Sequence, residues 1–385
     1  MPINKCRVCN HSFFKAPLLQ YKNMPKVAQF LPDAKFLKRD KGVDLGVYQC
    51  SGCGLVQLDS RPVPYYKEVI RAAGISEEMR SFRSKQFSAF VSKFSLKNKK
   101  VLEIGCGSGE YLSIMQQAGV IAYGLEHSNR SVKQCAKNGL KAIRGFIQSS
   151  SYKIKHAPFD AFFMLNFLEH LPDPNSTLRG IYRNLADGGV GIVEVPNLDM
   201  ILRNKLFSEF MRDHLCYFTR DTLILLLELN GFEVIECKEA WYEYTISAVV
   251  KKRRKADMTG FSSRQTQLKN ELARYTRRFK DKGIAIWGAG HQALAAISLL
   301  GLANKIKYVV DSAPSKQGKF TPATHLRIVA PDMLKKEPVA AVIIMAASYS
   351  DEVAGILRDK FSRNKTLSVS ILRANALEIV NPKEK

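Results

Sequence analysis

The stretch KKVLEIGCGSGEYL, residues 99–112, decides the fold. Its VLEI segment, residues 101–104, is a short apolar run of the kind that forms a buried parallel strand. Three glycines then recur at every second position: Gly105, Gly107 and Gly109. Because glycine has no Cβ, the backbone of such a turn can approach a ligand closely. A helix is expected over residues 110–117, so the stretch predicts a strand, a ligand-binding turn and a helix in an α/β fold.

The spacing of these glycines distinguishes two classes of cofactor. A dinucleotide site would read GxGxxG and hold a pyrophosphate at the helix N-terminus. Here the spacing is GxGxG, Glu110 stands in place of the last glycine, and Glu103 precedes the turn, where an acid suits a pyrophosphate poorly. The turn resembles motif I of the class I S-adenosylmethionine (SAM) methyltransferases, in which it faces a cationic cofactor without phosphates. That resemblance implies that SAM binds at Glu103, Gly105, Gly107 and Gly109; the alternative is an ordinary Rossmann turn.

The segments that follow supply the remaining strands of such a fold. Residues 122–126 form the next strand pattern and end on Glu126, and an acid at this strand end can accept both hydroxyls of a ribose. Further strands are expected within residues 159–170, 188–197, 232–237 and 245–250. The first of these ranges holds the fourth strand, and Asn166, which follows that strand, is a further candidate for the cofactor site. The full succession is similar to a class I SAM methyltransferase domain with a Rossmann-like fold.

Two cysteine pairs near the N-terminus have the spacing of zinc ligands. They are Cys6-x-x-Cys9 and Cys50-x-x-Cys53. Four thiolates on two such knuckles can surround one tetrahedral Zn²⁺ and leave no open position, so the zinc is expected to be structural and not catalytic. The alternatives are unrelated free pairs or a redox CxxC, although neither pair opens a helix as redox motifs do. The other cysteines, expected to pack in the interior, are Cys106, Cys135, Cys216 and Cys237.

The composition describes a folded, strongly basic protein. The chain has 385 residues, enough for two or three domains, and 46% of them are hydrophobic, which excludes a disordered chain. Lys and Arg number 59 against 35 Asp and Glu, a formal charge of +24. The basic residues are spread thinly and form neither an RNA motif nor a recognition helix, so we do not expect nucleic acid as the main partner. The charge suits a small anionic substrate, while a zinc-headed enzyme that modifies RNA is the alternative.

The sequence carries no pattern of membrane insertion or export. No apolar run approaches the ~20 residues that a membrane helix needs. The longest such run, residues 339–347, is expected to be a buried strand. The first residues form no apolar signal region, so we expect a cytoplasmic protein.

The order of the motifs predicts three domains. Residues 1–68 hold the cysteine pairs and are expected to form a small zinc-binding domain. Residues 69–254 carry the methyltransferase pattern. Residues 255–385 begin with an amphipathic linker helix, expected over 263–280, and continue into a second Rossmann-like unit.

That C-terminal unit has a glycine motif of its own. Gly288, Gly290 and Ala293 fit GxGxxA after a strand, and Asp311 stands near the end of the next strand. Taken alone, the motif indicates a nicotinamide dinucleotide site. His291, at the expected helix N-terminus, could meet a phosphate.

Three features together resemble the sugar C-methyltransferase family: the paired CxxC head, the SAM motif, and the tail KQGKFTP at residues 316–322. The resemblance covers essentially the whole chain. It implies an enzyme that methylates carbon 3 of a nucleotide-bound 4-keto-deoxysugar, with a zinc-binding head, a SAM domain and a C-terminal Rossmann-like domain. It also implies that the C-terminal domain helps to bind the nucleotide-sugar, with His291 and Lys316 as candidate contacts to the substrate. Nicotinamide binding and a purely structural unit are the alternatives.

In this family a Tyr-x-Glu-His string carries the base that deprotonates the carbon beside the ketone. The matching stretch reads MRDH, so the resemblance implies His214 as the catalytic base with Asp213 beside it, while Met211 replaces the tyrosine. Asn166 and His170 keep the family's spacing after the fourth strand. We expect these two side chains to hold or polarise sugar oxygens.

The departures from the family string leave two points open. Tyr65 or Tyr217 could supply the missing hydroxyl to the substrate, or the methyl group could go to oxygen or nitrogen instead of carbon. Tyr65 could also only pack the head on the next domain. His214 could merely satisfy a loop carbonyl, because Thr219 is a plausible N-cap of a helix over residues 220–230. The sequence predicts neither the sugar nor the oligomeric state.

Overall fold

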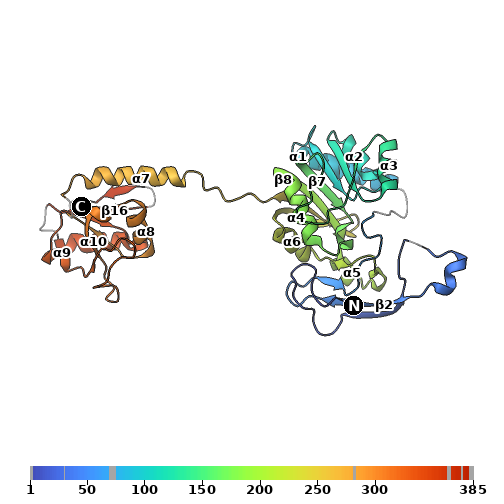
Figure 1. The fold of residues 1–385 in the computed structure, drawn as a ribbon, viewed down its shortest axis with the longest axis horizontal. Helices are drawn as coiled ribbons and strands as arrows, with labels where there is room; N and C mark the ends of the chain where they lie inside the picture. The colour runs from blue at the N-terminus through green and yellow to red at the C-terminus, as the bar shows by residue number, and fades with distance from the viewer. Residues whose placement is uncertain are drawn as a thin grey trace. The chain divides into compact units, whose positions relative to one another are not determined.

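The computed structural model describes residues 3–29, 31–68, 75–280, 283–361, 366–373 and 376–380. Its contacts divide the chain into two units, Met1–Lys255 and Ala256–Lys385. In Figure 1 the first runs from blue to yellow-green and the second from yellow to red. The expected zinc-binding head and methyltransferase domain both lie in the first unit.

A seven-stranded sheet forms the centre of the first unit, in the order β10-β11-β8-β7-β4-β5-β6. Its strands are β4 (Lys100–Ile104), β5 (Ile121–Glu126), β6 (Lys141–Arg144), β7 (Phe159–Leu165), β8 (Leu185–Pro196), β10 (Phe232–Ala240) and β11 (Thr245–Lys252). The five strands from β6 to β8 run parallel, and β11 and β10 are added antiparallel. Fully buried side chains such as Phe162 and Phe163 of β7 show why these strands read as apolar runs. The predicted α/β fold is confirmed.

Helices connect and cover these strands. They are α1 (Glu77–Lys93), α2 (Glu110–Gln117), α3 (Asn129–Lys137), α4 (Pro174–Asn184), α5 (Leu198–Arg203) and α6 (Arg220–Leu229), with the short 3₁₀ helices η2 (Leu168–His170) and η3 (Phe207–Glu209). Thr219 caps α6 as expected, because its hydroxyl accepts the N–H of Thr222 and the Thr222 hydroxyl accepts the N–H of Thr219. The carboxyl ends of β4, β5, β7 and β8 meet at one edge of the sheet, where ligands bind in open α/β folds.

The N-terminal head is a small sheet that takes one strand from the methyltransferase domain. Its order is β1-β2-β3-β9, from β1 (Leu19–Met24), β2 (Val43–Gln49), β3 (Val56–Leu58) and β9 (Cys216–Tyr217). Between β1 and β2 the chain runs out to the 3₁₀ helix η1 (Ala34–Arg39), drawn blue at the end of an arm in Figure 1. Because β9 begins two residues after His214, the pairing of β3 with β9 holds the head beside the predicted base.

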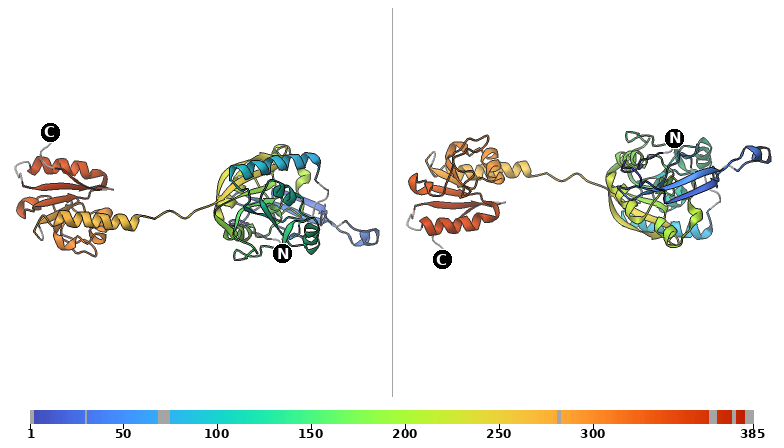
Figure 2. Two further views of the ribbon diagram at one scale, coloured as in Figure 1. Left: turned by 90° about the horizontal axis from the view of Figure 1, so that it is seen from above. Right: turned by 90° about the horizontal axis from the view of Figure 1, so that it is seen from below.

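The second unit has a six-stranded sheet in the order β14-β13-β12-β15-β16-β17, parallel except for β17. Figure 2 shows it edge-on between helices on its two faces. Its strands are β12 (Ile284–Trp287), β13 (Ile306–Val310), β14 (Ile328–Val329), β15 (Ala341–Ile344), β16 (Ser368–Leu372) and β17 (Leu377–Ile379). Its helices are α7 (Phe261–Thr276), α8 (His291–Leu299), α9 (Met333–Lys336) and α10 (Ser350–Phe361), with η4 (Ala303–Lys305) and η5 (Ala347–Tyr349).

The amphipathic linker helix begins and ends earlier than expected. α7 starts after Gly260, whose φ is 89°, and its last turn gives way to i→i+3 bonds, in which Phe279 N–H donates to Thr276 O. The apolar face expected on this helix is still buried at Leu272 and Tyr275. Among the described residues, no helix is long and apolar enough to cross a membrane.

Candidate active site

The first glycine turn joins β4 to α2 in a backbone conformation that needs glycine. Gly105, Gly107 and Gly109 have φ angles of 71°, 53° and 92°, in the left-handed region that residues with a Cβ adopt at a cost. A Cβ on Gly109 would lie 2.5 Å from Leu140 Cδ1 and 3.0 Å from Cys135 Sγ. A larger residue at Gly109 would have to displace the side chain of Leu140 and adopt a φ of 92°, so glycine is favoured at the start of α2.

Glu126, at the end of β5, holds this turn from the neighbouring strand. Its buried carboxylate accepts hydrogen bonds from the N–H of Gly107 (3.0 Å) and the N–H of Ser128 (2.7 Å). Burial raises the pKa of Glu126 above its ordinary value, and the main-chain N–H donors offset this only in part. A carboxylate has about four lone-pair sites, so Glu126 can keep both bonds and still accept ribose hydroxyls.

A small pocket lies beside the turn. It is lined by Lys67, Ile104, Gly105, Leu125, His127, Gly145, Phe146, Ile147, Phe167 and Thr177. The Phe146 ring is central, with the rings of Tyr66, His127 and Phe167 at centroid distances of 5.8, 6.3 and 6.5 Å. Aromatic walls are the surroundings that an adenine ring prefers, and the buried Glu126 beside them is an acceptor of the kind that a ribose needs. The residue types, though not the size of this pocket, therefore fit SAM.

The two remaining residues expected at the cofactor lie differently. Glu103 is buried within β4 and pairs in register with Gly124 of β5. Asn166 directly follows β7 with an exposed side chain and a φ of 48°, and its N–H donates to Glu194 O at 2.9 Å. Asn166 therefore lies at the ligand-binding edge of the sheet, while Glu103 lies inside the sheet just before that edge.

Three of the four expected catalytic residues meet between η2 and the loop that precedes β9, while no contact joins the fourth, Asn166, to them within the described part of the chain. His170 Nδ1 lies 2.8 Å from the carbonyl oxygen of Asp213, and the rings of His170 and His214 stand edge to face at 4.7 Å. The Tyr65 hydroxyl donates to Asp213 Oδ1 at 2.5 Å. The fold thus gathers Tyr65, His170, Asp213 and His214 from three separate segments into one cluster.

The two candidate tyrosines have different partners. Ala28 N–H, on the arm between β1 and β2, lies 3.2 Å from both Asp213 Oδ2 and the Tyr65 hydroxyl, so the head also closes on this carboxylate. The Tyr217 hydroxyl is held by the main chain of Met211, accepting its N–H at 2.9 Å and donating to its carbonyl at 3.1 Å. Tyr65 is therefore joined to the cluster directly, whereas Tyr217 supports the loop that carries it.

Burial sets the charge of this cluster. Burial and the neighbouring His170 lower the pKa of His214 to about 3, and burial also lowers the pKa of His170. Burial and the hydrogen bond to Asp213 raise the pKa of Tyr65 to about 12. At neutral pH both imidazoles are therefore neutral, and the half-buried His214 has a nitrogen lone pair that can take a proton.

Glu169 belongs to the same cluster and was missed by the sequence reasoning. It lies in η2, almost fully buried, and the polar atoms of Glu169, His170 and His214 all lie within 4.8 Å of one another. The adjacency of an acid to a candidate histidine was the signal that could have drawn attention to it.

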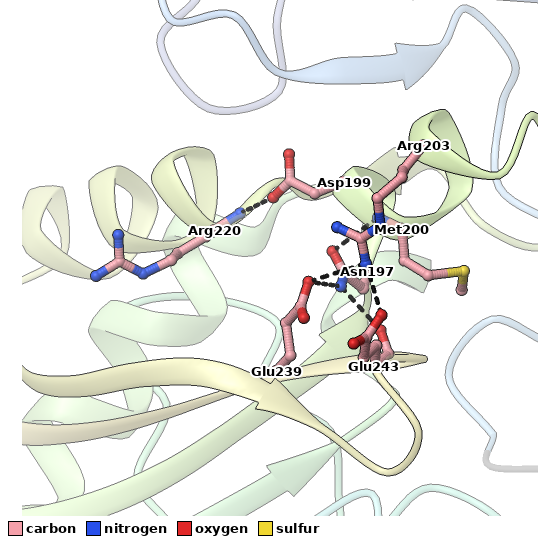
Figure 3. A network of polar contacts seen from close by, with 7 residues as sticks. All are labelled: Asn197, Asp199, Met200, Arg203, Arg220, Glu239 and Glu243. Carbon is pink, nitrogen blue, oxygen red and sulfur yellow. Dashed lines mark hydrogen bonds and ion pairs between the residues drawn. The ribbon is translucent and has the colours of Figure 1, made fainter.

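A polar network at the carboxyl end of β8 was also not expected (Figure 3). The Asn197 amide donates to Glu239 Oε1 (2.9 Å) and to Glu243 O (2.8 Å), and Arg203 pairs with Glu243 at 2.8 Å. Residues 241–243 all have positive φ, so the turn between β10 and β11 is strained and needs these contacts. The network keeps this part of the sheet edge in one conformation.

The four cysteines of the head lie together. The Sγ atoms of Cys6 and Cys53 are 3.6 Å apart, and those of Cys9 and Cys50 are 3.3 Å apart. A tetrahedron with Zn–S bonds of about 2.3 Å has sulfur–sulfur edges of about 3.8 Å. Main-chain N–H groups point at the sulfurs, including Gly52 N–H at 3.3 Å from Cys50 Sγ. The donor set and its spacing therefore fit a zinc ion.

The C-terminal unit has a larger pocket at its own glycine turn. It is lined by residues that include Trp287, Gly288, Gly290, His291, Asp311, Lys316 and Tyr349. Asp311 accepts the N–H of Ala289 (2.8 Å), the N–H of Ala313 (2.9 Å) and the ammonium of Lys316 (2.9 Å). Both expected substrate contacts of this unit, His291 and Lys316, thus line one pocket.

Family models and known methyltransferases are similar to parts of this chain. Residues 79–237 match the methyltransferase domain family, and residues 247–371 match the C-methyltransferase C-terminal domain. The chain is 23% identical to the C-methyltransferase NovU of Streptomyces niveus over 91% of each chain. It is 30% identical to a ubiquinone biosynthesis O-methyltransferase of Pseudomonas entomophila, over 25% of this chain and 44% of that protein. A SAM-dependent methyltransferase structure from Clostridium acetobutylicum matches 49% of this chain and 96% of its own, with 13% identity and a TM-score of 0.40.

The glycine turn, its acid and the matching domain define the class of protein: a SAM-dependent methyltransferase. Within that class, the C-terminal domain match and the likeness to NovU along most of the chain make this protein similar to the C-methyltransferases. The resemblance seen in the sequence is confirmed at this level.

Proposed function

We propose that this enzyme uses SAM to methylate the carbon beside the ketone of a nucleotide-linked 4-keto sugar. The observation that carries the proposal is the cluster in which a neutral, half-buried His214 lies against His170 and beside Asp213 and Tyr65. The likeness to NovU and the C-terminal domain support carbon as the methylated atom.

In this proposal His214 is the general base. Its imidazole takes a proton from the carbon next to the ketone, and the electron pair of that C–H bond becomes an enolate whose charge rests on oxygen. Bound SAM would supply the methyl group to the enolate carbon, with a new C–C bond forming as the S–CH₃ bond breaks and S-adenosylhomocysteine as the product. The low pKa of His214 in the free protein rises when the negative enolate forms beside it, which favours the transfer.

Two neighbours can stabilise the enolate. The Tyr65 phenol keeps its proton at neutral pH and can share it between Asp213 and a substrate oxygen. The exposed amide of Asn166 can donate a further hydrogen bond at the same edge of the sheet. Tyr65 thereby takes the task that Met211 cannot perform.

The nucleotide part of the substrate is assigned to the pocket of the C-terminal unit. Lys316 lines this pocket, where Asp311 offsets its charge, and His291 begins α8, whose N-terminal N–H groups attract anions. A nucleoside diphosphate suits this chemistry. The head carries a structural zinc on Cys6, Cys9, Cys50 and Cys53.

The test isolates the deprotonation step. Enzyme, a 4-keto-sugar nucleotide and S-adenosylhomocysteine are incubated in deuterated water, and proton NMR follows the signal of the carbon-bound hydrogen. The wild type should exchange this proton, and His214→Gln should bind both ligands but exchange roughly 10²–10⁴-fold more slowly. A substrate that is turned over without exchange, with its new methyl group on oxygen or nitrogen, would overturn the proposal.

The zinc assignment has its own test. Metal analysis of the purified protein should give one zinc per chain. Cys50→Ser should lower the melting temperature clearly, while the folded variant should bind SAM with an affinity close to that of the wild type. A folded protein that contains no metal would contradict the assignment.

A further inference from the structure

Glu169 is a buried carboxyl group without a hydrogen-bond partner. The residue is 1% exposed, and neither of its carboxyl oxygens has a partner within the described part of the chain. Burying an unpaired carboxylate costs several kcal/mol. A glutamate at such a position is therefore expected to have a role that offsets this cost. The atom that faces it is Nε2 of His170, 3.7 Å from Oε1.

The other nitrogen of His170 shows where the proton of this ring lies. Nδ1 is 2.8 Å from the carbonyl oxygen of Asp213. Because a carbonyl oxygen only accepts, Nδ1 carries the hydrogen, and the neutral ring turns its Nε2 lone pair toward Glu169. A carboxylate and a lone pair would repel each other at this position, so a proton belongs between them.

The same short helix also fixes the main chain on both sides of His214. Glu169 O accepts the N–H of Leu215 at 2.8 Å, and His170 binds the carbonyl of Asp213. The His214 ring then packs edge to face on His170 at 4.7 Å. A change in the orientation of the His170 ring would therefore move His214 as well.

We propose that Glu169 is a positioning residue that acts as a neutral carboxylic acid, donating a hydrogen bond to His170 Nε2 and thereby holding His214 in place. The inference rests on the proposed role of His214 as the base. The present gap of 3.7 Å is longer than a hydrogen bond, and such contacts tighten when ligands bind. In this role Glu169 touches no substrate atom and acts only through His170.

The protonation state of Glu169 is consistent with this role. Burial raises the pKa of Glu169 to about 8, so the acid is mostly neutral at pH 7. The other titratable groups around it are His170, His214 and Asp213, together with the Cys216 thiol of β9, whose pKa burial also raises. As the pH rises through about 8, Glu169 loses the proton that it donates, and the support of His170 is lost with it.

Two substitutions of similar size separate donation from mere packing. Glu169→Gln keeps an N–H donor that does not titrate, whereas Glu169→Leu fills the space without a donor. Glu228→Gln makes the same chemical change on the exposed face of α6 and serves as the control. Thermal unfolding identifies any variant that fails to fold.

The first readout is the rate of the deuterium exchange described above, measured from about pH 6 to 10. The exchange rate of the wild type should fall above pH 8, where Glu169 loses its proton. Glu169→Gln should exchange within about threefold of the wild type at pH 7 and should show no such fall above pH 8. Glu169→Leu should exchange up to about 100-fold more slowly, the cost of a base displaced by about 1 Å. Equal losses in the two variants, or an unchanged alkaline limb in Glu169→Gln, would overturn the proposal.

The second readout does not depend on the reaction. Nitrogen-15 NMR of the histidine rings should show His170 protonated at Nδ1 with a hydrogen-bonded Nε2 in the wild type and in Glu169→Gln, and an altered Nε2 shift in Glu169→Leu. If no variant exchanges the carbon proton but the ring signals change as expected, the role of His214 as base is wrong and the hydrogen bond of Glu169 stands. If the ring signals are the same in all variants, Glu169 does not bind His170 and the inference is wrong.

Discussion

The two glycine turns of the molecule, one in each unit, have the same construction. In both, a strand leads through glycines into a helix, and an acid at the end of the next strand reaches back to the turn. Glu126 accepts the N–H of Gly107 at 3.0 Å, and Asp311 accepts the N–H of Ala289 at 2.8 Å. Each acid also accepts the N–H two residues beyond itself, Ser128 in one case and Ala313 in the other.

The difference lies in the charge beside the acid. Lys316 pairs with Asp311 at 2.9 Å, while the charged neighbour that acts on Glu126 is a second carboxylate, Glu68. Burial pushes the pKa of both acids up, but hydrogen bonds from Ala313, Lys316 and Ala289 outweigh it and hold the pKa of Asp311 below its ordinary value. The same backbone motif therefore places its acid beside a second carboxylate in one unit and beside a neutralising lysine in the other. This difference accords with the cationic cofactor and the anionic substrate group proposed above for the two turns.

The largest expected effect compares the glycine at the start of the helix in each turn, Gly109 before α2 and Gly290 before α8. Gly109→Ala forces a Cβ to within 2.5 Å of Leu140 at a φ of 92°. We expect SAM affinity to fall by about 10- to 100-fold, because an alanine in this left-handed conformation strains the turn. Gly290→Ala is the matched control, since its φ is −86° and no described atom lies within 4 Å of the added Cβ. Titration calorimetry that finds the two variants alike would break the comparison.

The next effect tests the acid of the first turn. Glu126→Ala removes the acceptor for the ribose and for Gly107 N–H, and hydrogen bonds to a charged group contribute about 1.5–3 kcal/mol each. SAM affinity should fall at least about tenfold in calorimetry. Asp311→Ala makes the corresponding change in the second turn and should leave SAM affinity unchanged. An unchanged affinity in Glu126→Ala would mean that another residue binds the ribose.

These local features were accessible from the sequence because each depends on neighbouring residues. Glycine spacing, an acid at a strand end, the two CxxC pairs and the N-cap at Thr219 all lie within short segments. The contacts of Asp213 could not be predicted in this way, because Tyr65 and Ala28 reach it across 148 and 185 residues of chain. The buried state of Glu169 was hidden for the same reason, since it depends on contacts of η2 with β9, which lies far along the chain.

A smaller effect is expected at the second turn. Lys316→Ala removes a partly exposed ammonium, whose interactions are worth no more than about 1 kcal/mol. Nucleoside diphosphate affinity should therefore fall by at most about fivefold, with SAM affinity unchanged. Lys319→Ala, on the exposed part of the same loop, is the control. A parallel titration with NADH decides the alternative, because tight NADH binding without competition from nucleoside diphosphates would assign this pocket to a nicotinamide cofactor.

The smallest effect is a difference in acid sensitivity at the first turn. The carboxylate form of Glu126 is the one that attracts the SAM cation and accepts ribose hydroxyls. Because burial raises its pKa above the ordinary 4.5, protonation on acidification begins at a higher pH than for an exposed glutamate, and SAM affinity should fall there. Glu126→Gln cannot titrate, so its weaker affinity should stay level over the same interval, while Asp311→Asn should reproduce the wild-type curve. A wild-type affinity that is constant until the protein unfolds, or an equal decline in Glu126→Gln, would show that the charge of Glu126 does not attract the cofactor, and the contrast in charge between the two turns would then lose its functional meaning.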